Sequence, residues 1–89
     1  MVTVEFASSL RRHVECAPQQ VMARDLRGAL DAALAAAPAL APYVFDDQRN
    51  VRKHVAVFIN QEMLRERTQL DLVLQDGDRV LVIQALTGG

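Results

Sequence analysis

The sequence predicts an α+β domain, in which one main helix packs on one face of a mixed sheet of about four to five strands. Three observations support this class. Residues 2–6 and 54–60 alternate apolar side chains with others, as half-buried strands do. Residues 24–37 repeat apolar side chains at helical spacing, and residues 79–84 form the β-branched, apolar run of a buried strand. A single domain spanning residues 1–89 is therefore expected.

The N-terminal segment 2–6 is expected to be the first strand. Ser8 begins a turn after it, and residues 12–16 are expected to return antiparallel to the first strand. Pro18 and the two glutamines that follow it are expected to end this return.

The segment 24–37 is expected to be the main helix, because it combines an apolar stripe at helical spacing with a high alanine content. Ala23 stands where a capping Ser, Thr or Asp would be expected, so the helix start is predicted to be poorly capped. Gly28 costs up to ~1 kcal/mol relative to alanine and is expected to face a close neighbour. Pro38 should end the helix, and Pro42 should keep the next stretch irregular. The stripe consists of Leu26, Ala29, Leu30, Ala33, Leu34 and Ala37.

The second half of the chain alternates strands with turns. Residues 46–50 are expected to be a polar turn, and residues 54–60 a strand. Residues 60–62 should form a hairpin turn, and the Asp-Gly-Asp sequence at 76–78 is a strong turn signal. Residues 79–84 follow as the last strand, which is expected to pair in parallel with the first at the centre of the sheet.

Composition and charge exclude several classes of protein. The chain of 89 residues is 51% hydrophobic and 24% charged, which is typical of a globular domain. With a net charge of −1 and no long basic cluster, no nucleic-acid partner is expected. No signal segment and no apolar run of ~20 residues is visible, so no membrane partner is expected. The single cysteine fits a reducing compartment, and a cytoplasmic location is expected.

The chain shows no catalytic or metal-binding constellation. Cys16 lies in an alternating apolar segment and is expected to fill the core. His13 and His54 are separated by the whole helix and have no neighbouring ligands, so no metal site is expected. The aspartates at 46–47 and 76–78 lack the calcium-loop pattern and are expected to be turn residues. Phosphate-loop, hydrolase and metalloprotease motifs are also absent.

A second group of apolar residues falls on the face of the sheet that points away from the core. Phe58, Leu81 and Ile83 alternate with Val57 and Val80, which are expected to be buried. If the two strands are neighbours, the outer face carries a contiguous apolar patch, and such patches usually mark a partner surface. Two alternatives remain open: loops cover this face, or the two faces are assigned the wrong way round.

The sequence ends in two glycines directly after the predicted last strand. Glycine at ~7% of residues gives two such positions by chance in roughly one chain in two hundred. Without a Cβ atom, Gly88 and Gly89 can pass through a slot that is too narrow for other residues. Residues 85–89 are therefore expected to be a flexible tail, and the α-carboxylate of Gly89 is the candidate reactive group.

These features resemble the ubiquitin-like β-grasp sulfur carriers, such as the molybdopterin-synthase small subunit and the thiamin-pathway carrier. The similarity spans nearly the whole chain. It is most specific at Asn60, at the Leu-Gln-Asp-Gly-Asp-Arg-Val segment 74–80 and at the terminal Gly-Gly. Two residues depart from the family pattern. Gln61 replaces a glycine that usually follows the asparagine, and Thr87 stands where alanine or serine is common.

The resemblance implies a β-grasp fold and a protein that is not an enzyme by itself. It implies that an E1-like adenylating enzyme uses ATP to activate the carboxylate of Gly89, while the carrier binds no cofactor stably. Sulfide from a persulfide donor then displaces AMP and leaves a thiocarboxylate. Leu86, Thr87 and Gly88 would thread the partner's active site, and the apolar patch would dock on it. The further partners are a sulfur-accepting biosynthetic enzyme and, as another candidate, a sulfurtransferase.

Two rival functions share the same sequence features. A ubiquitin-like modifier would use the same activation to link Gly89 to lysine side chains of target proteins. A non-reactive β-grasp interaction module would use only the docking surface. The sequence also leaves the pathway open among molybdenum cofactor, thiamin, cysteine and specialised metabolite biosynthesis.

Overall fold

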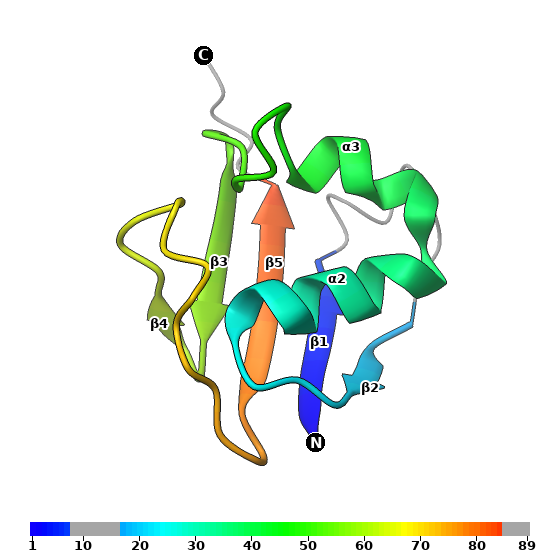
Figure 1. Ribbon diagram of the computed structural model, residues 1–89, viewed down its shortest axis with the longest axis vertical. Coiled ribbons are helices and arrows are strands. Elements are labelled where there is room, and N and C mark those ends of the chain that lie inside the picture. The colour runs from blue at the N-terminus through cyan, green and yellow to red at the C-terminus, as the bar shows by residue number, and fades with distance from the viewer. Residues whose placement is uncertain (8–16, 85–89) are drawn as a thin grey trace.

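The computed structural model describes residues 1–7 and 17–84. These residues form a mixed five-stranded sheet, in the order β2-β1-β5-β3-β4, with helices packed against one face (Figure 1). The predicted α+β class and the mixed sheet with one main helix are confirmed. The predicted tail, residues 85–89, lies outside the described residues. The strands are β1 (Val2–Phe6), β2 (Gln19–Val21), β3 (Val55–Ile59), β4 (Glu62–Met63) and β5 (Arg79–Gln84).

Strand β5 is the centre of the sheet. It pairs in parallel with β1, with Val4 opposite Val80, and antiparallel with β3, with Val57 opposite Val82. The expected parallel pairing of the first and last strands is thus confirmed. Because side chains alternate along a strand, this register sends the paired valines to the same inner face. All four are at most 2% exposed.

The antiparallel partner of β1 differs from the expectation. The structure pairs β1 with Gln19–Val21, with Val2 opposite Val21, whereas Gln19 and Gln20 were expected to end the return. Pro18 is tolerated directly before this edge strand because it need not donate to the ladder there. The predicted return strand at residues 12–16 lies outside the described residues.

The main helix, α2 (Leu26–Ala36), starts later and is better capped than the sequence suggested. Asp25 is the N-cap, and its Oδ1 accepts a hydrogen bond of 2.8 Å from the backbone N–H of Gly28. A Cβ atom on Gly28 would lie 3.0 Å from that same oxygen. The close neighbour expected for Gly28 is therefore its own capping carboxylate, and the predicted poor cap at Ala23 is wrong.

The helix lies across the inner face of the sheet (Figure 1), and its apolar stripe closes the core. Leu26, Leu30 and Ala33 on this stripe are fully buried. Complete burial of a leucine side chain contributes roughly 1.5–3 kcal/mol. The largest fully buried side chains are Phe6, Leu26, Leu30, Leu40, Leu70, Val2, Val4, Val44, Val51, Val57 and Val80.

The segment after α2 is more regular than expected. A 3-10 turn (Pro38–Leu40) leads into the short helix α3 (Ala41–Val44). Pro42 falls in the first turn of α3, where a missing N–H costs nothing because the first helical N–H groups have no partner within the helix. The expected irregular stretch is therefore wrong, and Leu40 and Val44 add to the core instead.

The predicted polar turn and hairpin are both present. Asp46 organises the first: its Oδ1 accepts from the N–H groups of Gln48 and Asn50 at 2.9 and 3.0 Å. The hairpin joins β3 to β4 with Asn60 at φ 50° and Gln61 at φ 74°. Two central residues with positive φ are the mark of a type I′ turn, which matches the twist of the flanking strands.

No helix among the described residues is both long enough and apolar enough to cross a bilayer.

Candidate functional site

The chain leaves the sheet along its central strand. Gln84, the last residue of β5, pairs with Val55 at the start of β3. Gly89 is the fifth residue after Gln84, so a fully extended chain would reach on the order of 18 Å from the strand end. The candidate tail residues Leu86, Thr87, Gly88 and Gly89 themselves lie outside the described part of the chain.

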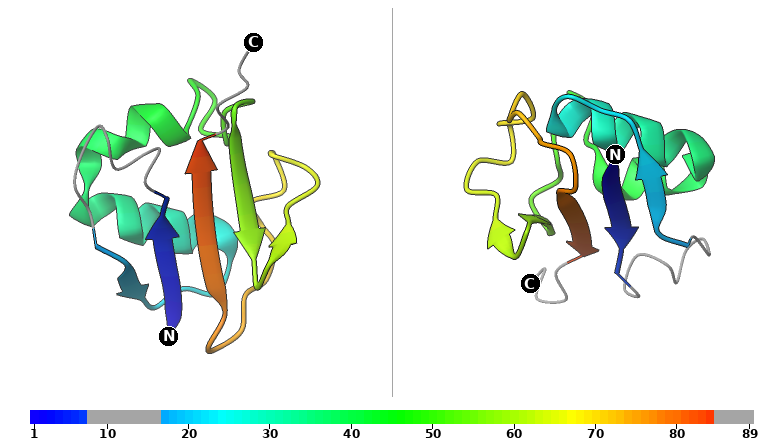
Figure 2. Two further views of the ribbon diagram at one scale, coloured as in Figure 1. Left: turned by 180° about the vertical axis from the view of Figure 1, so that it is seen from behind. Right: turned by 90° about the horizontal axis from the view of Figure 1, so that it is seen from below.

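The three predicted patch residues come together on the outer face of the sheet. Phe58 of β3 lies directly opposite Leu81 of β5, and Ile83 lies two positions further along β5, opposite Ala56. All three large side chains are partly exposed, whereas Val57 is 2% exposed on the opposite face. In the view from behind, no described helix covers this face (Figure 2, left).

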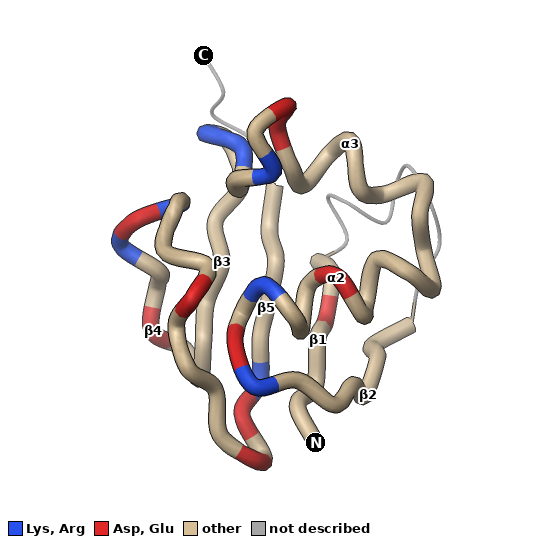
Figure 3. Tube along the Cα trace, in the orientation of Figure 1, with Lys and Arg blue, Asp and Glu red and all other residues tan. Residues whose placement is uncertain are grey.

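The patch forms the floor of an open hollow of about 570 Å³, here called the sheet-face hollow. Figure 3 shows that charged residues lie mainly in loops and at strand ends, while β3 carries no charge along its length. The hollow therefore has an apolar floor with polar residues around it. It is lined by Thr3, Glu5, Phe58, Asn60, Gln61, Arg79, Val80, Leu81 and Ile83.

Asn60 links the hairpin to the turn that precedes β5. Its side-chain amide donates to Asp78 Oδ1 at 2.8 Å, and its side-chain oxygen accepts from the backbone N–H of Arg79 at 2.9 Å. Its own backbone N–H donates to the carbonyl oxygen of Arg79 at 2.9 Å. The sequence singled out Asn60 and the 74–80 segment separately, and the structure shows that they form one network at the edge of the hollow.

The carboxylate of Asp78 completes this network. Its Oδ2 accepts from the backbone N–H of Gln75 at 2.8 Å. The hydrogen bonds that the backbone of Gln75 and the side chain of Asn60 donate stabilise the ionised carboxylate. They hold the pKa of Asp78 below its usual range. The start of β5 is thereby held by charge-assisted hydrogen bonds.

Sequence reasoning missed the charged pair beside the hollow. Arg79 Nη2 lies 3.9 Å from Glu5 Oε1, across the β1–β5 pairing. Strand parity alone could have placed both residues on the outer face, because Glu5 alternates with the buried Val4 and Phe6. Their proximity requires the register of Thr3 opposite Arg79, which the sequence does not reveal.

No group of metal-ligating side chains is found in residues 1–7 and 17–84. His54 is exposed and directly precedes β3, while Cys16 and His13 lie outside these ranges. In the part of the chain that the structure describes, the candidate site thus consists of an apolar hollow on the outer face of the sheet and the end of the central strand β5.

Comparison with known proteins gives a consistent result. The model of the ThiS family matches residues 4–89. SAMP1 from Haloferax volcanii has a TM-score of 0.83 at 24% identity, covering 99% of this chain and 98% of that one. A chain of the Amycolatopsis orientalis BexX/CysO complex has a TM-score of 0.82 at 20% identity, covering 100% of both. Urm1 from Trypanosoma brucei has a TM-score of 0.72 at 23% identity, covering 99% and 94%. No curated protein matches by sequence.

Proposed function

Because the chain belongs to the ThiS family of ubiquitin-like β-grasp sulfur carriers, we propose that it carries sulfur as a thiocarboxylate on Gly89. Members of this family are small carriers and not catalysts, so the chain is not an enzyme by itself. The observation that carries the proposal is the extent of the family match, which runs through the terminal Gly88-Gly89. The central strand β5, which ends at Gln84, supports it by leading straight into this tail.

A carboxylate is a poor electrophile until one oxygen becomes part of a good leaving group. In the proposed reaction, the carboxylate of Gly89 attacks the α-phosphorus of ATP and pyrophosphate leaves. Bisulfide then attacks the carbonyl carbon of the acyl-adenylate, AMP leaves with the electron pair of the broken C–O bond, and a thiocarboxylate remains. ATP is bound by the partner, and the carrier itself needs no stably bound cofactor.

The carrier contributes reach and docking. The tail must enter a nucleotide site of the partner, and glycine keeps its last positions narrow. We assign the docking to the sheet-face hollow, with Phe58, Leu81 and Ile83 as its apolar contacts. Because Ile83 and the tail belong to the same stretch of chain, a partner seated on the hollow also controls where the carboxylate points.

The proposed partners are an E1-like adenylating enzyme, a sulfur-accepting biosynthetic enzyme and a sulfurtransferase. The similar CysO chain is described in a complex with BexX, which supports docking of this chain on a partner protein. Because the proposed activation needs ATP and a reducing environment, we propose that the protein acts in the cytoplasm.

A second candidate is a protein modifier. Similarity to a small archaeal modifier protein favours it. In this function a target lysine Nζ, instead of sulfide, attacks the activated carbonyl carbon of Gly89, and an isopeptide bond forms as AMP leaves.

The activation step is tested by ATP–pyrophosphate exchange with the adenylating activity of the native cell extract. Wild type should support exchange, whereas deletion of Gly89 moves the carboxylate back by up to ~3.6 Å and should abolish it. Gly88→Val should also abolish exchange, since its branched side chain blocks the slot and restricts φ. Thr68→Ser, at an exposed position outside the hollow, is the control and should support exchange. Exchange by the Gly89 deletion at the wild-type rate would contradict the proposal.

The docking step is tested by Phe58→Ser. Loss of this side chain should weaken binding to the adenylating enzyme by ~2 kcal/mol, about thirtyfold, while the domain stays folded. Thr68→Ser, at an exposed position that does not line the hollow, is the control and should bind as wild type does. Unchanged binding by Phe58→Ser would show that the partner docks elsewhere.

A further inference from the structure

The outer face of the sheet is polar and charged along β1 and mainly apolar along β5 beyond Arg79. Strand β5 contributes Arg79, Leu81 and Ile83 to this face, and β1 contributes Thr3 and Glu5. Glu5 lies opposite Leu81, and Thr3 lies opposite Arg79. The apolar floor is therefore bounded by a carboxylate along β1 and by a guanidinium at the start of β5.

The pair of charges contributes little to folding. The nitrogen–oxygen distance of 3.9 Å is too long for a hydrogen bond, and the side chains of Arg79 and Glu5 are 72% and 43% exposed. Exposed ion pairs of this kind typically contribute little to the stability of a protein. Glu5 and Arg79 can therefore give up their mutual ion pair and form ion pairs with a partner protein at little cost in stability.

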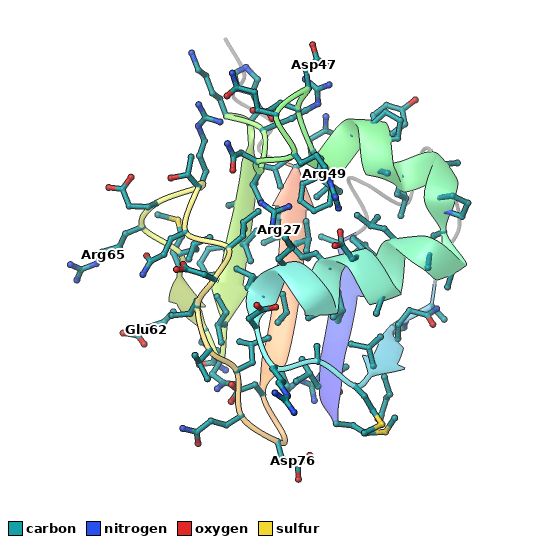
Figure 4. The ribbon with its side chains drawn as sticks, viewed as in Figure 1. Arg27, Asp47, Arg49, Glu62, Arg65 and Asp76 are labelled. Carbon is teal, nitrogen blue, oxygen red and sulfur yellow. The ribbon has the colours of Figure 1, made fainter. Side chains whose placement is uncertain are left out.

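The ion pair between Arg49 and Asp31, by contrast, is close enough to form a hydrogen bond. Arg49 Nη2 lies 2.8 Å from Asp31 Oδ1 beside a second hollow, on the helix side. Figure 4 shows Arg49 close to Arg27, whose guanidinium donates to the carbonyl oxygen of Arg49 at 2.9 Å. These charges are engaged in hydrogen bonds that connect α2 to the polar loop.

The backbone positions that carry the two charges of the sheet-face hollow are fixed relative to each other. The backbone of Arg79 is bonded in both directions to Asn60, through its N–H and its carbonyl oxygen. Glu5 lies on β1, whose pairing with β5 sets its position relative to Leu81. A partner therefore meets a preorganised pattern of negative charge, apolar floor and positive charge.

We propose that Glu5 and Arg79 select the adenylating enzyme that docks on the sheet-face hollow. The enzyme's docking surface presents a cation to Glu5, a carboxylate to Arg79, and between them an apolar side chain that packs against Leu81. This inference rests on the proposed function, because it names the chemistry of the surface that the same carrier must bind. Complementary charges around an apolar centre govern association rate and partner choice more than the strength of the closed complex.

The test is a charge swap, Glu5→Arg combined with Arg79→Glu. The swap keeps the net charge and the possibility of an internal ion pair but reverses the pattern that the partner meets. In ATP–pyrophosphate exchange with the native adenylating activity, the KM for the carrier should rise about tenfold or more, with kcat retained at saturation. The increase should shrink at higher salt, because exposed charges are screened.

The matched control swaps Arg65→Glu with Glu66→Arg, at two exposed positions outside the hollow. Figure 4 shows Arg65 pointing away from the domain. This control should keep the wild-type KM. If the swap lowers the melting temperature, the single variants Glu5→Gln and Arg79→Gln replace it, and each should raise KM with kcat retained. A wild-type KM in the swap or in both single variants would overturn the selection and leave the proposed function standing. Absence of exchange by wild type would remove the proposed function and the selection together.

Discussion

At the scale of single residues, Asn60 joins two segments of the chain that lie far apart in the sequence. Its side chain joins the β3–β4 hairpin to Asp78 and Arg79, which are 18 and 19 residues away. The sequence indicated that each segment matters but could not show that they meet, because the contact depends on β3 lying beside β5. Asn60 also tolerates its φ of 50°, since asparagine adopts the left-handed region more readily than most residues.

Gln61 is the strained member of the same turn. With φ at 74°, it occupies a conformation that glycine adopts without steric cost. We expect Gln61→Gly to raise the free energy of unfolding by roughly 0.5–1 kcal/mol, measured by urea denaturation. The control is Gln20→Gly on edge strand β2, which should lower stability because glycine loses more entropy in a strand. A Gln61→Gly variant less stable than wild type would mean that the turn is not strained.

Asp78 gives the protein a defined response to acid. Its pKa in the folded state lies below the ordinary value of 3.8, because Gln75 and Asn60 donate to its carboxylate. The unfolded state therefore binds more protons at low pH, so the stability from Asp78 is present above about pH 4 and is lost as pH falls through the lower, folded-state pKa. Urea denaturation at neutral pH and near pH 3 should show a smaller acid loss in Asp78→Asn than in wild type. Exposed Asp71→Asn serves as the control, and identical acid losses in Asp78→Asn and wild type would contradict the assignment.

At the scale of elements, the helix and strands with a clear apolar period could be predicted from the sequence. The start of the helix and the short edge strand could not. The helical stripe around Leu30 and the alternation of β3 were enough to place the core. The start of α2 was missed because the capping role of Asp25 depends on the exact first turn, which periodicity does not define. Strand β2 was missed because three residues at a sheet edge have no period to read.

The helix stripe is predicted to hold the core together. Leu30 is fully buried, so Leu30→Ala should lower the free energy of unfolding by ~2–5 kcal/mol through lost burial and the remaining cavity. Leu81→Ala is the matched control, and the substitution at this partly exposed position should cost less than Leu30→Ala, about 1 kcal/mol. Equal effects of the two substitutions on urea denaturation would mean that the inner face of the sheet is not the dominant core.

At the scale of the whole molecule, the two faces of the sheet have separate roles. The inner face and α2 make the core, and the outer face presents the hollow on the strand that leads to the tail. The parallel pairing of β1 with β5 could be predicted, because the N-terminal and C-terminal strands carry the strongest apolar patterns. The proximity of Glu5 and Arg79 could not be predicted, because it depends on the exact register of β1 against β5, which the alternation of apolar residues does not define.

The central claim is that the carboxylate of Gly89 becomes a thiocarboxylate, and intact mass spectrometry tests it most directly. The wild-type chain is incubated with the adenylating activity of its native extract, ATP and a sulfide source, and its mass is recorded with and without ATP. The account predicts an ATP-dependent mass increase equal to the exchange of one oxygen for sulfur, located by fragmentation at Gly89 and absent in Gly88→Val. A mass that stays unchanged in the presence of ATP, or that shifts only through linkage to lysine side chains of other proteins, would contradict the account.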